Sequence, residues 1–272
     1  MKRIIIVMTL TILTIMGLFF TNQMLLLAKS SATASDAMIT ANQLYETGQY
    51  LQSAQAYQQL VDQGYVDSSL YYNLGNAYFK AGDFGRAVLN FRRAEQLAPR
   101  DADIEANLEL ARAQAIDQLD WNPEQRGILE TLTELTQEWT TLDELALAAL
   151  TTWLVFALLV IAVTSTTKGG LLREILQYAL VVTTLVLVLG IVGLTSRMYV
   201  ERAQPEAVVV ASEINVTSGP GQQYLTEFAL HSGTEAKVIE TRENWVRLAV
   251  SDGELQGWVP SSSVEVVVGP IS

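Results

Sequence analysis

Two long apolar runs constrain this chain more than any other feature. Residues 145–163 hold nineteen positions without a charge, residues 175–194 hold twenty, and only residues 164–174 separate them. As an α-helix each run would be about 30 Å long, at about 1.5 Å per residue, which matches the hydrocarbon thickness of a bilayer. The sequence therefore predicts a transmembrane helical hairpin, with spans at 145–163 and 175–196. The parts on either side of it would emerge on the same face of the membrane.

The N-terminal segment, residues 1–34, has the pattern of a secretory signal. Lys2 and Arg3 precede an apolar stretch, and Ala32 and Ala34 offer a small-residue cleavage site. The alternative is an uncleaved N-terminal anchor, because the apolar stretch continues to Leu27 and is long enough to cross a bilayer. Both interpretations place the two basic residues in the cytoplasm and the following residues outside.

The charges of the hairpin loop orient the rest of the chain. Lys168 and Arg173 lie in the loop 164–174, and basic loops favour the cytoplasmic side. We therefore expect a cytoplasmic loop, with the N-terminal and C-terminal soluble parts on the extracytoplasmic side. Residues 119–144 read as an acidic amphipathic linker helix, which fits that side because membrane-surface helices in the cytoplasm are usually basic.

Residues 35–118 have helical periodicity that repeats with an offset of 34. The second unit has small and aromatic residues where two helices must approach and a proline where the second helix must stop. These markers are Tyr71, Leu74, Gly75, Tyr78, Ala87, Phe91, Ala94 and Pro99. The unit resembles the tetratricopeptide repeat, and we expect an α-helical solenoid of two repeats and a capping helix.

The resemblance to tetratricopeptide repeats implies a protein-binding groove lined by the first helix of each unit. The polar and aromatic residues at its inner positions are Asn42, Tyr45, Tyr72, Asn73, Asn76, Phe79 and Lys80. Asparagine and tyrosine can hydrogen-bond and stack on an extended peptide or a partner helix. The alternative for Tyr72 and Phe79 is packing between helices.

Residues 205–270 change to short β-rich runs separated by turn signals, which predicts a small all-β barrel of five or six strands. The segments 215–220, 244–248 and 257–259 resemble the bacterial SH3-like (SH3b) domain, although this family usually carries arginine where this chain has Thr217. The ligand candidates are Tyr224, Trp245 and Trp258. The two tryptophans could instead fill the core of so small a domain.

Composition and motifs argue against several classes of function. A net charge of -12 argues against nucleic acid, which needs a basic surface to displace counterions. We find no catalytic motif, no metal-ligand cluster and no cofactor motif, and His231, the sole histidine, has no marked nucleophile or orienting acid. The two apolar runs contain no ionisable group that a transport pathway would use. We therefore expect no enzyme, metal site or cofactor.

The ordered set of modules resembles the BatE-like family of the aerotolerance (Bat) group, which are bacterial envelope proteins. The resemblance implies a non-enzymatic scaffold in the bacterial cytoplasmic membrane, with its repeats and SH3b domain in the periplasm. It implies protein partners of the von Willebrand factor A-domain type and a role in oxidative-stress tolerance or envelope integrity. The alternative is a peptidoglycan-binding tether or a regulator of a cell-wall hydrolase.

Overall fold

A computed structural model describes residues 35–117, 140–165, 170–250 and 253–267. The chain divides into two compact units, Met1–Val66 and Asp67–Ser272. Three predictions fall outside the described residues: the signal or anchor at 1–34, the position of Lys168, and most of the linker helix at 119–144.

The described part of the first unit is a pair of helices. Residues 35–46 form one helix, and α2 (Tyr50–Asp62) follows after a turn in which Gly48 adopts φ +78°. The hydroxyl of Ser53 donates to the backbone oxygen of Ala41 at 2.8 Å, and the hydroxyl of Tyr57 donates to Oδ1 of Asn42. The Tyr57 side chain is fully buried, so the two helices are joined by hydrogen bonds as well as by packing.

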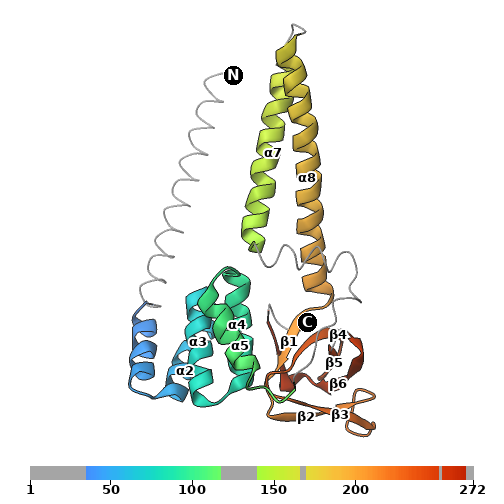
Figure 1. The fold of residues 1–272 in the computed structure, drawn as a ribbon. Coiled ribbons are helices and arrows are strands. Elements are labelled where there is room, and N and C mark those ends of the chain that lie inside the picture. Colours follow the sequence, from blue (N-terminus) through green and yellow to red (C-terminus); the bar gives the residue numbers. More distant parts are fainter. Residues whose placement is uncertain (1–34, 118–139, 166–169, 251–252, 268–272) are drawn as a thin grey trace, which may run out of the picture. The chain divides into compact units, whose positions relative to one another are not determined.

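The second unit begins with α3 (Ser68–Ala81), α4 (Phe84–Leu97) and α5 (Ala102–Arg112). Each helix starts at an aspartate whose carboxylate accepts backbone N–H groups of the first turn, the preferred N-cap arrangement: Asp67, Asp83 and Asp101. The three helices follow one another in Figure 1 as the helical repeat that the sequence predicted.

Close packing of α3 against α4 depends on Gly75. A Cβ at this position would lie 2.8 Å from the ring of Phe91, which is fully buried. Ala87 and Ala94 on α4 are also fully buried. The small residues of the repeat pattern therefore let the two helices approach closely, and the phenylalanine fills the space between them.

Two long apolar helices follow, α7 (Leu142–Ser165) and α8 (Leu171–Ala203). They pack against each other in opposite directions (Figure 1). Both are long and apolar enough to span a membrane, and no residue of α7, all of which is described, is buried. Large apolar side chains therefore face outward along both helices.

Only Gln204 and Pro205 separate α8 from a β-sheet. Its strands are β1 (Glu206–Val209), β2 (Glu213–Thr217), β3 (Thr226–His231), β4 (Glu235–Arg242), β5 (Trp245–Val250), β6 (Leu255–Pro260) and β7 (Val264–Val266). They pair antiparallel in the order β3-β2-β6-β5-β4-β1-β7. Inward-facing valines and leucines from these strands, among them Val209, Val216, Val246 and Leu248, form one apolar core.

The predicted closed barrel of five or six strands is wrong. The described residues form seven strands, and no strand pairing among them joins β3 to β7, so the sheet has two edges. The prediction missed this because turn spacing marks where strands begin and end but carries no information on whether the strands at the two ends of the sheet pair.

Candidate functional site

The candidate binding site is a polar strip formed by Tyr72 and Asn76 of α3 with Asn107 of α5. The amide nitrogen of Asn107 lies 2.8 Å from the hydroxyl of Tyr72 and 3.2 Å from Oδ1 of Asn76, and donates to both. All three side chains are half-buried. We call these residues the α3/α5 strip.

The hydrogen bonds within the α3/α5 strip fix which groups face a ligand. Because Oδ1 of Asn76 accepts from Asn107, the Asn76 amide is oriented with its N–H groups away from that contact. Among the described residues, no hydrogen bond uses the amide nitrogen of Asn76 or the amide oxygen of Asn107. The strip therefore offers N–H donors from Asn76 on α3 and an oxygen acceptor from Asn107 on α5. Such groups can bind the C=O and N–H groups of a peptide backbone.

The other predicted groove residues of α3 differ in their surroundings. Phe79 is half-buried and meets Phe84 edge-on, with ring centroids 5.5 Å apart. The ring of Tyr72 also packs on Phe91 at 6.0 Å, so its hydroxyl is the part that joins the strip. Asn73 is half-buried and Lys80 is exposed. Their predicted role in partner binding stays a prediction.

The two groove residues predicted in the first unit already have partners within it. Oδ1 of Asn42 accepts from Tyr57, and the ring of Tyr45 lies edge-on to Tyr50 at 5.2 Å. Burial raises the pKa of Tyr57 to about 12. The Tyr57 hydroxyl therefore remains a proton donor throughout the neutral range.

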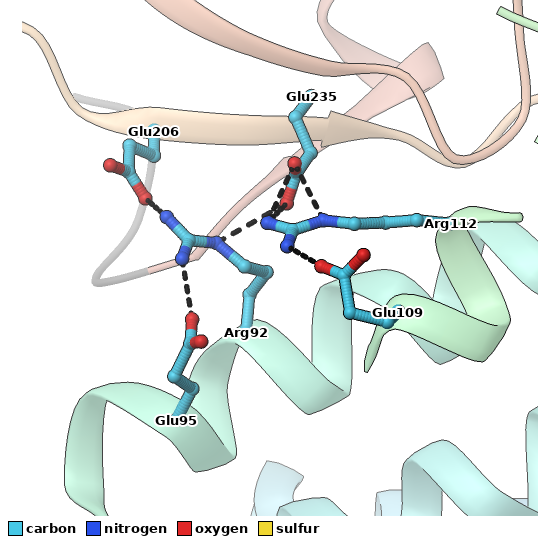
Figure 2. Close-up of polar contacts among 6 residues, drawn as sticks. All are labelled: Arg92, Glu95, Glu109, Arg112, Glu206 and Glu235. Atoms are coloured by element: carbon cyan, nitrogen blue, oxygen red, sulfur yellow. Dashed lines mark hydrogen bonds and ion pairs between the residues drawn. The ribbon is translucent and has the colours of Figure 1, made fainter. Parts of the chain in front are cut away.

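Helix α4 is bound to the sheet by half-buried charged side chains. Figure 2 shows the guanidinium of Arg92 between Glu95 on its own helix, Glu206 on β1 and Glu235 on β4. Arg112, from α5, also contacts Glu235, with Nη2 3.0 Å from Oε2. We call Arg92, Arg112, Glu206 and Glu235 the arginine clamp.

Charge pairing outweighs the cost of burial in the arginine clamp. Burial lowers the pKa of Arg92, but Glu206, Glu235 and Glu95 raise it further, so the pKa lies above its ordinary value. The same balance raises the pKa of Arg112, where Glu235 is the main partner. Both guanidinium groups therefore stay charged, and the clamp holds two half-buried cations against carboxylates from two strands.

Two further arginines of α4 extend the contact to the sheet edge. Arg93 donates to the backbone oxygens of Val266 at 2.8 Å and Val267 at 3.2 Å. Arg86 approaches the carboxylate of Glu265 at 4.0 Å. These contacts cover β7, one of the two edges of the sheet, which would otherwise present unpaired backbone groups.

A third contact joins the end of the repeat to strand β3. The Asp117 carboxylate accepts from the backbone N–H of His231 at 2.7 Å and from the hydroxyl of Thr234 at 2.6 Å, and its second oxygen lies 2.9 Å from Nδ1 of His231. Burial raises the pKa of Asp117, but these hydrogen bonds outweigh it, and the pKa lies below its usual range. His231 thus lies in the repeat–sheet interface.

Sequence reasoning missed the whole repeat–sheet interface. The signal that could have found it is the concentration of Arg86, Arg92 and Arg93 on one helix of an acidic chain. Asn107 was also missed, because its importance lies in two hydrogen bonds to another helix, which its residue type alone does not reveal.

The structure does not gather the three sheet candidates into one pocket. Trp258 is buried, with the guanidinium of Arg242 5.2 Å from its ring centroid, and Trp245 is half-buried opposite Arg242. Tyr224 is 44% exposed and its ring covers Gly219, where an added Cβ would lie 2.5 Å away. Thr217, which stands where the SH3b family has arginine, donates to the backbone oxygens of Gly219 and Trp258.

Comparison with known proteins finds a family match within the helical part. Residues 68–101 match the tetratricopeptide repeat family. A second similarity is to the putative N-acetylmuramoyl-L-alanine amidase YrvJ of Bacillus subtilis (strain 168), which is 37% identical over 62 residues. This match covers 23% of the present chain and 12% of YrvJ, so the chain spans only a small part of that relative.

Proposed function

We propose that this chain is a membrane-anchored, non-enzymatic scaffold that binds a protein partner through the α3/α5 strip. The observation that carries the proposal is the pair of hydrogen bonds from Asn107, which orient Tyr72 and Asn76 before any ligand arrives. Pre-oriented polar groups lose little side-chain entropy on binding and so favour affinity. The tetratricopeptide match, which covers α3 and α4, supports protein binding by this part of the chain.

The arginine clamp supports the choice of this face for the partner. Helix α4 uses its arginines to hold β1, β4 and β7, so that face of the repeat is occupied by the chain itself. Among the described residues, the three strip residues Tyr72, Asn76 and Asn107 take no part in these contacts with the sheet. The sheet then acts as a rigid support for the repeat.

The finer assignment is a Bat-type aerotolerance or envelope-stress complex. In this proposal α7 and α8 anchor the chain in the bacterial cytoplasmic membrane, and the repeat and an SH3b-type sheet lie in the periplasm. The partners would be von Willebrand factor A-domain membrane proteins. The order of repeat, two apolar helices and β-sheet along the chain supports this assignment.

Crosslinking in native membranes, followed by identification of the bound proteins, tests the scaffold. The expected result is a partner whose yield falls at least tenfold in Asn76→Ala combined with Asn107→Ala. The control is Glu105→Ala, an exposed residue of α5 two positions from Asn107 and therefore on another side of the helix. Equal loss in the control, or no loss in the double variant, would rule out the strip as the binding site.

A second candidate function is attachment to peptidoglycan through the sheet. The similarity to a protein named as an amidase favours it, because such an enzyme acts on the cell wall. Full-length protein in detergent should then be retained on isolated cell wall, and Tyr224→Ala with Trp245→Ala should abolish the retention. Wall binding without any crosslinked partner would favour the tether over the scaffold.

A further inference from the structure

We propose that Tyr178 and Tyr199 mark the two surfaces of the bilayer along helix α8, with the hydrocarbon layer between them. Their side chains are among the most exposed on the helix, at 74% and 66%. They are 21 positions apart in the sequence, which is about 31 Å along an α-helix and matches the hydrocarbon thickness of a bilayer. This inference rests on the proposed membrane anchoring.

The chemistry of tyrosine fits this placement. A phenol ring has an apolar body and a polar tip, so it prefers the level where acyl chains meet headgroups. At about 100° per residue, the two tyrosines are about 60° apart around the helix and so face the same side. Between them, the only ionisable side chain of α8 is Arg197.

Arg197 is compatible with this placement because it faces protein. Its side chain is buried, and Nη1 donates to the backbone oxygen of Thr140 at 2.7 Å. A charge close to the hydrocarbon is tolerated when protein groups satisfy it. The same contact places Thr140, two positions before the start of α7, at the level of Arg197, which is itself two positions from Tyr199.

Further polar groups gather at this end of the hairpin. The carboxylate of Glu144 accepts from the backbone N–H of Thr141 at 3.0 Å, which turns it toward the N-terminal end of α7. There it pairs with Arg100 of the repeat at 2.7 Å. Polar and charged side chains thus lie at the end of the hairpin where Tyr199 marks the proposed bilayer surface.

The proposed depth differs from that given by apolar length alone. Hydropathy places the second span at 175–196, whereas the tyrosines place it at 178–199, a shift of about 4.5 Å. Ile175 distinguishes the two, because its side chain is 54% exposed and lies in hydrocarbon in the first case and in the headgroup layer in the second.

The chain has no cysteine, so single-cysteine variants of the full-length protein report depth without background. A thiol in hydrocarbon stays protonated and does not react with a water-soluble maleimide. In native membranes we expect labelling of Ile175→Cys and protection of Val192→Cys and of Leu189→Cys, the mid-span control. Protection of Ile175→Cys, or labelling of Val192→Cys, would overturn the proposed depth.

A second set of variants tests whether the tyrosines set this depth. Tyr178→Leu with Tyr199→Leu removes the polar phenol groups that hold these positions at the bilayer surfaces. Residue 175 can then enter the hydrocarbon, and labelling of Ile175→Cys should fall at least threefold. Replacing both tyrosines with tryptophan should keep the labelling, because tryptophan prefers the same level. Unchanged labelling in the leucine pair would overturn the anchoring role of the tyrosines.

Alkaline carbonate extraction separates failure of this inference from failure of the proposed function. Release of the wild-type protein into the soluble fraction would contradict membrane anchoring itself. Retention in the membrane with a different labelling pattern would contradict only the depth.

Discussion

The Nε atom of Arg92 in helix α4 lies 3.2 Å from Oε1 of Glu235 in strand β4, and Arg112 of helix α5 contacts the same carboxylate. A single glutamate therefore separates two guanidinium groups that stay charged. Without its carboxylate the two arginines would repel each other inside the repeat–sheet interface.

Glu235→Gln should therefore loosen the repeat from the sheet by about 2 kcal/mol, less than for a fully buried pair because the side chains keep some exposure. Hydrogen exchange of the full-length protein in detergent should show faster exchange in α4 and β4. Glu240→Gln is the control, since Glu240 pairs with the exposed Arg242 on its own strand. Similar exchange in both variants would contradict a dominant role for Glu235.

Gly85→Ala should also separate α4 from the sheet. A Cβ at this position would lie 2.2 Å from the hydroxyl of Ser232 and 2.8 Å from the backbone oxygen of Val209. The serine side chain can rotate away but the backbone oxygen of Val209 cannot move. Gly85→Ala should therefore speed hydrogen exchange in α4, and adding Ser232→Gly should restore little of the lost protection from exchange. Gly190→Ala, where a Cβ meets nothing within 4 Å, should leave hydrogen exchange unchanged. Full recovery in the double variant would mean that the serine alone causes the clash.

The contact of Asp117 with β3 should weaken in acid. The pKa of Asp117 is lower in the folded protein than its ordinary value of 3.8, so its contribution is present above pH 3.8 and is lost as the pH falls through the folded value. The thermal midpoint of the wild type should drop more between pH 5 and pH 3 than that of Asp117→Asn, which cannot ionise. Parallel curves would show that this carboxylate contributes nothing that depends on pH.

The Tyr57 hydroxyl should ionise only in strong alkali. Its raised pKa means that the folded state holds the phenol proton more tightly than the unfolded state. The stabilisation is therefore complete below pH 10 and is lost between pH 10 and about pH 12. Absorbance titration should show one phenol ionising near pH 12 that is missing in Tyr57→Phe. Titration of Tyr57 near pH 10 would mean that the first helix pair is open in solution.

Sequence periodicity predicted the helices of the second repeat unit and the two apolar helices, because each pattern is local and its spacing is visible along the chain. The open sheet was not predictable in the same way, since closure depends on which edge strands pair. The arginine clamp was also out of reach, because Arg92 and Glu206 are 114 positions apart and each alone looks like a solvated surface charge.

The α3/α5 strip was predictable in part. Tyr72 and Asn76 follow from their place on the first helix of a repeat, which faces the groove. Asn107 could not be predicted in this way, because its role in the strip depends on two hydrogen bonds to a neighbouring helix and not on a charge of its own. A polar residue that orients others leaves no mark in composition.

The separation of Arg92 and Glu206 also has a consequence for biosynthesis. The two residues flank α7 and α8, so they can meet only after both helices have been made and, if both cross the bilayer, only when both have inserted. If only one helix were inserted, Arg92 and Glu206 would lie on opposite sides of the bilayer. In a membrane-spanning chain the ion pair therefore forms only when the repeat and the sheet have reached the same compartment.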